Sequence, residues 1–329
     1  MSNETNIRNT QISSLNGIQK VYFIGIGGIG MSAIARYFHS KGIEVSGYDR
    51  TPTALTKKLE QEGISIHYNE DVNAIPKDVD LVVYTPAVPK EHAELLYYQQ
   101  HGYKVVKRSD VLQAISADSF NICIAGTHGK TTITTMIAHI LRHSGYGCNA
   151  FLGGISVNYQ TNFWSSANNV CVIEADEYDR SFLKLSPDIA IITAMDADHL
   201  DIYGDEKTMR DAFVEFAGKI REGGLLIIKF GLKQPPKSPG GGLANSQPSL
   251  VEGSDKESEL SKSEPSQHSE APPPEGFGEA VLTYSLQNDS ADVFAQNIKI
   301  NEGGYVYDVS GKLALSNVEL RIGGMHNVE

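Results

Sequence analysis

The 329-residue sequence predicts an α/β protein built from two successive domains. Strand-like and helix-like segments alternate along most of the chain, which is the pattern of parallel sheets covered by helices. A glycine-rich loop stands between a strand and a helix twice, near residue 27 and again near residue 127. The length also exceeds what a single hydrophobic core usually organises, so two domains are expected.

The first group of elements follows a polar, aperiodic stretch over residues 1–18, which we expect to be a loose arm. Apolar runs predict strands at 21–27, 43–49 and 78–88. Apolar residues at helical spacing predict helices at 31–42, 53–63 and 91–102, and residues 104–115 close the group. We therefore assign residues 19–118 to the first domain.

The second group predicts strands at 120–126, 168–176, 188–195 and 223–230, with helices at 131–145 and 205–220. Its strands are continuously apolar, which favours burial on both faces, as in a parallel sheet. Four β-like segments follow, and GG and SG turns between them indicate antiparallel hairpins: 280–286, 292–300, 303–311 and 313–322. We assign residues 119–329 to the second domain.

Residues 232–279 interrupt this second domain, because 23 of these 48 residues are Ser, Pro or Gly. Such a composition buries too little apolar surface to offset the entropy lost on ordering, which predicts a flexible surface insertion. A recognition tail is the alternative. The sequence stops where a further helix is expected to begin, so we expect it to be cut at residue 329.

Composition excludes several classes of protein. The net charge of −12 argues against a nucleic-acid binder, which needs a basic face. The sequence contains no run of 18 uncharged apolar residues, so it predicts no membrane-spanning helix. Its polar start lacks the apolar core of a secretory signal. Three cysteines without metal-ligand spacing are expected to be buried thiols in a reducing compartment. These features predict a cytoplasmic enzyme that acts on small molecules.

The first glycine-rich loop, Gly25-Ile26-Gly27-Gly28-Ile29-Gly30, has the pattern G-x-G-x-x-G. Glycines there permit the tight turn and a close approach of backbone N–H groups to a diphosphate at the helix N-terminus. Asp49 lies 19 residues beyond Gly30, where an acid can bind ribose hydroxyls. The pattern predicts a Rossmann-like domain that binds a diphosphate, and an NAD-dependent oxidoreductase is one interpretation of it.

The second loop predicts a P-loop-type ATPase domain, with backbone amides and a lysine for phosphates and a threonine hydroxyl for Mg²⁺. It is shorter than a Walker loop, because Ile124 stands six residues before the lysine. A hydride-transfer enzyme has no need of such a loop. Its residues are Gly126, Thr127, His128, Gly129, Lys130, Thr131 and Thr132.

Two further residues are candidate metal ligands. Glu174 lies at the carboxyl end of one predicted parallel strand and His199 follows another, at the edge where Thr131 is also expected. A carboxylate, an imidazole and a hydroxyl can each supply one ligand to Mg²⁺. This shared edge predicts a magnesium site.

Five ordered segments, IGIGGIGMSAIA, GTHGKTTITT, EADEYDRSF, DADHLDIY and GGMHN, together resemble the Mur ligases of peptidoglycan synthesis. The resemblance is greatest to the branch that adds L-alanine to UDP-N-acetylmuramic acid. It covers the chain from about residue 20 to the end, outside residues 232–279. It implies an ATP-dependent ligase with a UDP-substrate domain, a central ATPase domain and a C-terminal domain, the last of which is missing here.

The resemblance also implies roles for single residues. The first loop would hold the diphosphate of UDP-N-acetylmuramic acid, with Asp49 near the nucleoside. Thr85 and Ala87 would line the same site. Implied diphosphate ligands are Gly27, Gly28 and Gly30. Implied catalytic residues are Lys130, Glu174 and His199. Lys130 would hold the ATP phosphates, and Glu174 and His199 would hold Mg²⁺ together with Thr131. His326 and Asn327 match the motif that approaches adenine.

The implied reaction has two steps. The lactyl carboxylate of the sugar nucleotide attacks the γ-phosphate of ATP, which gives an acyl phosphate and ADP. The amine of L-alanine then attacks the acyl carbon, and phosphate leaves. Two alternatives remain beside the oxidoreductase. The chain could be a nucleotide-binding module without turnover, or part of a sister ligase that attaches a preformed peptide.

Overall fold

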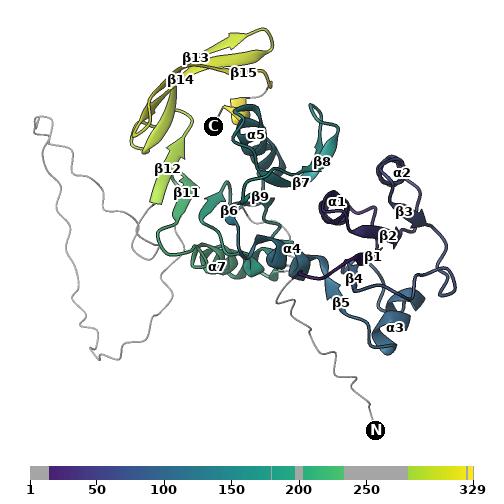
Figure 1. The fold of residues 1–329 in the computed structure, drawn as a ribbon. Helices are drawn as coiled ribbons and strands as arrows, with labels where there is room; N and C mark the ends of the chain where they lie inside the picture. The colour runs from purple at the N-terminus through teal and green to yellow at the C-terminus, as the bar shows by residue number, and fades with distance from the viewer. Residues whose placement is uncertain (1–14, 179, 197–202, 233–280, 324, 329) are drawn as a thin grey trace, which may run out of the picture.

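The computed structural model describes residues 15–178, 180–196, 203–232, 281–323 and 325–328. These form two α/β units, each around its own sheet, as Figure 1 shows. The predicted α/β fold is confirmed. The insertion predicted at 232–279 falls almost wholly outside the described residues, and so does most of the arm predicted at 1–18. Leu15 and Ile18, at the end of that arm, pack against the core.

The first unit contains a five-stranded parallel sheet in the order β3-β2-β1-β4-β5. Its strands are β1 (Lys20–Ile24), β2 (Glu44–Tyr48), β3 (Ser65–His67), β4 (Leu81–Tyr84) and β5 (Val105–Lys107). Its helices are α1 (Ile29–Ser40), α2 (Ala54–Gln61), α3 (Ala93–Gln100) and α4 (Arg108–Ser116). The strand order reverses beside β1, and ligands of such sheets bind where the order reverses, at the carboxyl ends of the strands.

The second unit contains a ten-stranded sheet in the order β15-β14-β13-β12-β11-β10-β6-β9-β7-β8. Its strands are β6 (Phe120–Ala125), β7 (Asn149–Ser156), β8 (Thr161–Trp164), β9 (Val170–Glu174), β10 (Ile189–Ile192), β11 (Leu225–Lys229), β12 (Val281–Ser285), β13 (Val293–Asn301), β14 (Gly304–Gly311) and β15 (Leu315–Leu320). Its helices are α5 (Lys130–His143), η1 (Ser181–Lys184), α7 (Glu206–Ala217) and η2 (Met325–Asn327).

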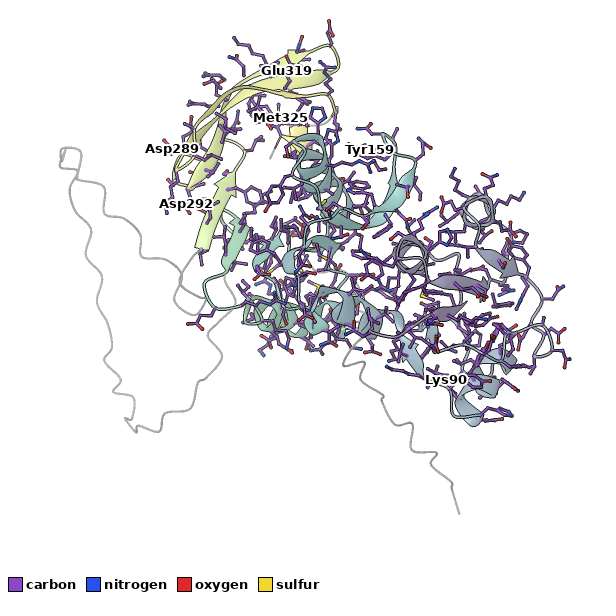
Figure 2. The ribbon with its side chains drawn as sticks, in the orientation of Figure 1. Lys90, Tyr159, Asp289, Asp292, Glu319 and Met325 are labelled. Carbon is purple, nitrogen blue, oxygen red and sulfur yellow. The ribbon has the colours of Figure 1, made fainter. Side chains whose placement is uncertain are left out.

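The antiparallel hairpins predicted after residue 279 are confirmed for β13, β14 and β15 but not for β12. Strand β12 instead extends the parallel sheet beside β11 and pairs in parallel with the start of β13. Asp292, labelled in Figure 2, accepts hydrogen bonds from the Thr283 backbone N–H (2.7 Å) and hydroxyl (2.8 Å). This contact holds the two strands side by side despite the loop between them.

The two units share buried apolar surface. One cluster of buried side chains takes members from β1 and α1 of the first unit and from β7, β8 and β9 of the second. Among the described residues, no helix combines the length and the apolar character needed to cross a bilayer.

The three thiols predicted to be buried are confirmed as buried and free: Cys123, Cys148 and Cys171. Burial raises the pKa of each thiol, and that of Cys148 reaches about 11. Because the thiolate is the reactive form, we expect a thiol reagent at pH 8 to leave the native chain unmodified. Titration with Ellman's reagent should then count three thiols only after unfolding. Rapid modification of the native chain would contradict this burial.

Candidate functional site

The first glycine-rich loop runs from the end of β1 into α1, as predicted. Gly25 adopts a φ of +85° and donates its N–H to the Tyr48 carbonyl (2.8 Å). Gly28 caps the start of α1, so the loop presents the free N–H groups of a helix N-terminus. A Cβ built on Gly27 would lie 2.6 Å from Thr56 Cγ2, which only glycine avoids. The local sequence therefore builds an open helix N-terminus, which is the kind of helix end that favours an anion.

Asp49 directly follows β2, and the structure brings it to the first loop. Its Oδ2 accepts the Gly27 N–H (2.7 Å), and its Oδ1 accepts the Thr51 N–H (3.2 Å). The carboxylate thus holds the loop in shape, in addition to any contact with a ligand.

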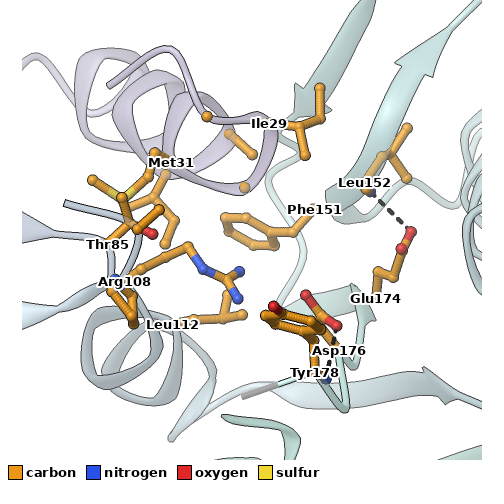
Figure 3. Close-up of a pocket in the computed structure, with 17 residues that line it drawn as sticks. Ile29, Met31, Thr85, Arg108, Leu112, Phe151, Leu152, Glu174, Asp176 and Tyr178 are labelled. Carbon is orange, nitrogen blue, oxygen red and sulfur yellow. Dashed lines mark hydrogen bonds between the residues drawn. The ribbon is translucent and has the colours of Figure 1, made fainter. Parts of the chain in front are cut away.

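A pocket of about 530 Å³ opens beside this loop, between the two units (Figure 3). The first unit lines it with the predicted substrate residues Gly28, Gly30, Thr85 and Ala87, which come from the loop after β1 and the loop after β4. The second unit contributes β7, the last residue of β9 and the segment that follows β9. Those lining residues are Phe151, Leu152, Gly153, Glu174, Asp176 and Tyr178. Of the predicted substrate residues, Gly27 and Asp49 do not line the pocket.

Arg108 is a pocket residue that the sequence analysis missed. It follows β5 as the first residue of α4, and its side chain points into the pocket (Figure 3). A Cβ on Gly30 would lie 2.8 Å from its Nη1. Within the part of the chain that the structure describes, its guanidinium has no hydrogen-bond or ion-pair partner. A cation directly after a parallel strand was the available signal, because that position faces the ligand edge.

The second glycine-rich loop joins β6 to α5. Gly126 has a φ of +131°, and a Cβ there would lie 2.2 Å from Thr193 Oγ1. Gly129, with a φ of +79°, caps α5. The Thr127 hydroxyl accepts the Asp196 N–H (3.2 Å), so it supports the loop. The loop is therefore pinned against the end of β10, and its helix N-terminus is presented to solvent.

Lys130 is held at the base of this loop. Its Nζ donates to the Gly126 carbonyl and to Glu177 Oε1, both at 2.7 Å. The Glu177 side chain is fully buried, and that of Lys130 is 14% exposed. Glu177 is a second residue that the sequence analysis missed, although it stands in the segment EADEYDRSF used for the resemblance.

Glu174 connects the second loop to the pocket. It ends β9 and lines the pocket, and its Oε1 accepts the hydroxyl proton of Thr131 (2.9 Å) in the first turn of α5. Its Oε2 accepts the Gly153 N–H (2.9 Å). Burial raises the pKa of Glu174, while the bonds from Thr131 and Gly153 act in the opposite direction. A carboxylate beside a hydroxyl fits a hard cation such as Mg²⁺.

The other predicted site residues are not gathered here. His199 lies outside the described residues, and no group of three or more His, Cys, Asp or Glu side chains that could hold a metal ion occurs among those described. Thr132 and His128 are exposed at the loop surface. Asn327 lies in η2 with His326, and its Nδ2 donates to the Gly323 carbonyl (2.6 Å).

Two protein-family models match successive parts of this chain. The model of the Mur ligase family, catalytic domain, matches residues 20–120, and that of the Mur ligase middle domain matches residues 124–234. A UDP-N-acetylmuramate–L-alanine ligase from Porphyromonas gingivalis is 44% identical over 320 residues, which cover 95% of this chain and 62% of that protein. One from Flavobacterium johnsoniae is 41% identical over 96% of this chain and 61% of its own length.

Solved structures show the same fold. The UDP-N-acetylmuramate-alanine ligase from Thermotoga maritima has a TM-score of 0.72 at 25% identity, covering 94% of this chain and 62% of that one. A UDP-N-acetylmuramate:L-alanyl-gamma-D-glutamyl-meso-diaminopimelate ligase from Neisseria meningitides has a TM-score of 0.73 at 21% identity, covering 94% and 90%. The chain spans about three fifths of the length of the curated relatives it matches. With both domain models matched in order along it, the chain belongs to the Mur ligase family.

Proposed function

We propose that this chain supplies the sugar-nucleotide and ATP sites of an enzyme that joins L-alanine to UDP-N-acetylmuramic acid. The observation that carries the proposal is the position of Glu174. This carboxylate lines the pocket beside the first loop and also binds Thr131 in the first turn after the second loop. A sugar nucleotide held by its diphosphate at α1 would therefore extend its sugar toward the same carboxylate that lies beside a triphosphate held at α5.

In this proposal, the first loop and Arg108 bind the diphosphate of UDP-N-acetylmuramic acid. The helix N-terminus supplies N–H donors, and the guanidinium supplies a cation that fits phosphate oxygens. The pocket volume of about 530 Å³ suits the sugar end of such a ligand. Asp49 shapes the loop through the Gly27 N–H and lies toward the nucleoside.

The proposed chemistry begins when the lactyl carboxylate of the sugar nucleotide attacks the γ-phosphate of ATP. The bond to ADP breaks, and an acyl phosphate forms; the amine of L-alanine then attacks the acyl carbon and releases phosphate. An anion that attacks a polyanion is repelled, so the Lys130 ammonium is placed to offset the charge on the transferring oxygens. Mg²⁺, when bound at Thr131 and Glu174 with His199, would supply further positive charge there. His326 and Asn327 would approach the adenine.

We further propose that this enzyme works in the cytoplasm, where ATP is available and buried free thiols stay reduced. An oxidoreductase is the less favoured function. The first loop alone fits a nicotinamide dinucleotide, but that function gives no role to the Lys130 loop or to its link with Glu174.

Calorimetric titration of the chain with UDP-N-acetylmuramate, UDP and NADH tests the proposal. We expect the two uridine nucleotides to bind and NADH not to bind. Arg108→Met should weaken the binding of both uridine nucleotides by roughly ten- to a hundredfold, because one charge-assisted contact is worth about 1.5–3 kcal/mol. Lys107→Met, which removes the adjacent exposed cation outside the pocket, is the matched control and should change neither. Binding of NADH in place of the uridine nucleotides would overturn the assignment.

A further inference from the structure

Asn162 of the second unit forms a buried polar contact with the first turn of α1. It lies on β8, and it is fully buried. Its Nδ2 donates to the Ile29 carbonyl (2.6 Å) and to Ser32 Oγ (2.9 Å), while its Oδ1 accepts from Arg36 Nη1. Both ends of the amide are therefore used, and all three contacts cross from one unit to the other.

Arg36 extends this contact within the first unit. Its Nε donates to Glu62 Oε2 (2.7 Å) and its Nη2 to Glu62 Oε1 (3.0 Å), and its side chain is only 7% exposed. Glu62 stands at the C-terminal end of α2. A paired, planar guanidinium of this kind has little freedom, so the N–H group that it donates to Asn162 Oδ1 is fixed in direction.

Aromatic packing adjoins the polar contact. The Tyr37 ring of α1 lies with its centroid 5.9 Å from that of Phe151 and 6.1 Å from that of Phe163. Phe151 in turn lines the pocket. Helix α1 lies along β7 and β8 in Figure 1, and both strands contact it. The polar contact thus sits in a packed interface, where small displacements are resisted.

We propose that Asn162 is a positioning residue, which fixes the first glycine loop relative to Glu174 across the boundary between the units. Gly28, Ile29 and Ser32 belong to the loop and the first helical turn, so a hold on Ile29 and Ser32 sets where the loop N–H groups lie. The pocket takes one wall from each unit. When a diphosphate is bound at the loop, the attached sugar extends toward the second unit. Asn162 sets the distance between the loop and that unit. This inference rests on the proposed function for its ligand.

Binding of UDP and UDP-N-acetylmuramate provides the first test. Asn162→Leu should leave UDP affinity within about twofold, because UDP contacts the first unit, and weaken UDP-N-acetylmuramate by roughly tenfold, because the sugar no longer meets the second unit in register. Asn162→Asp keeps the packing but places an oxygen against the Ile29 carbonyl, so the same selective loss is expected. Equal weakening of both ligands, or of neither, would overturn the proposal.

The control is Asn149→Leu. Asn149 is also buried, and its Nδ2 donates to the carbonyls of Asn168 (3.1 Å) and Val170 (3.4 Å), which lie within the second unit. This variant loses a comparable buried amide without touching α1. It should therefore leave the ratio of the two affinities unchanged, whatever it does to stability.

A distance measurement tests the interface without any ligand. Spin labels attached at Lys58→Cys in α2 and Ile140→Cys in α5, two exposed positions, report the distance between the units. The three native thiols are buried, so the labels should react only at the introduced cysteines. Asn162→Leu should broaden the distance distribution, and Asn149→Leu should not. An unchanged distribution in Asn162→Leu would refute the positioning role. If the unsubstituted chain binds neither nucleotide, the proposed function fails, and these distances still decide whether Asn162 fixes the interface.

Discussion

Replacing Lys130 by Met should lower ATP-dependent ligation by roughly two to three orders of magnitude in an enzyme that contains this chain. The Lys130 Nζ is placed at the base of the second loop by the Gly126 carbonyl and Glu177. Without this cation, the charge that spreads over the transferring phosphate oxygens is not offset. UDP-N-acetylmuramate affinity should stay near normal, because the first loop lies on the other unit. Initial rates and calorimetry on the same preparation measure the two effects.

Lys130→Met is also expected to lower the free energy of unfolding, and this effect has to be distinguished from the loss of catalysis. The Glu177 carboxylate is fully buried, and loss of its lysine partner is expected to cost about 3–5 kcal/mol. Lys130→Met/Glu177→Gln also removes the buried charge and should recover much of the stability while the turnover stays low. Urea unfolding provides the measurement. If the double variant recovered turnover as well, or if the single variant lost sugar-nucleotide binding in equal measure, the two-site assignment would fail.

The sequence was sufficient to predict both loops because their signals are local. Glycines at fixed spacing, a lysine next to a helix start and an apolar strand before each loop are all short-range features. The strand-end position of Glu174 was predictable for the same reason, since parallel strands bring their carboxyl ends to one edge. The structure places Glu174 at Thr131 accordingly.

Contacts between distant segments were not predictable in this way. Arg108, Glu177 and Asn162 take their roles from partners that tertiary packing brings close. Their neighbours in the sequence do not identify those partners, although the position of Arg108 directly after a strand was a local signal that it faces a ligand. Strands β7 and β8 were missed because β7 contains two glycines and β8 has four residues, so neither shows a clear period of two. Strand β12 was expected in a hairpin with the strands that follow it. Its actual partner, β11, lies on the other side of residues 233–280, and no local pattern indicates a pairing across so long a segment.

Replacing Glu174 by Gln should weaken the dependence of ATP affinity on Mg²⁺. In the unsubstituted chain we expect Mg²⁺ to tighten ATP binding, and in Glu174→Gln this gain should fall by roughly tenfold or more, because an amide is a weaker ligand for a hard cation. Asp176→Asn is the matched control. Asp176 also lines the pocket, but its Oδ1 accepts the Tyr178 N–H (3.1 Å). Calorimetry with ATP, with and without Mg²⁺, should separate them, and equal losses would assign the effect to general charge at this edge.

The same Glu174→Gln change should stabilise the metal-free chain at neutral pH. Burial raises the pKa of Glu174, so the folded state holds its proton more tightly than the unfolded state does. The stability contributed by this group is therefore fully present below the ordinary glutamate pKa, about 4.3, and is lost as the pH rises through the raised value. Thermal unfolding in EDTA should show the variant above the unsubstituted chain at about pH 7, with the difference shrinking toward about pH 4.5. The folded chain is expected to be less stable without the cation because the buried Glu174 carboxylate then keeps an unbalanced charge. If Glu174→Gln were no more stable than the unsubstituted chain at neutral pH, the hydrogen bonds from Thr131 and Gly153 would be sufficient to stabilise the carboxylate.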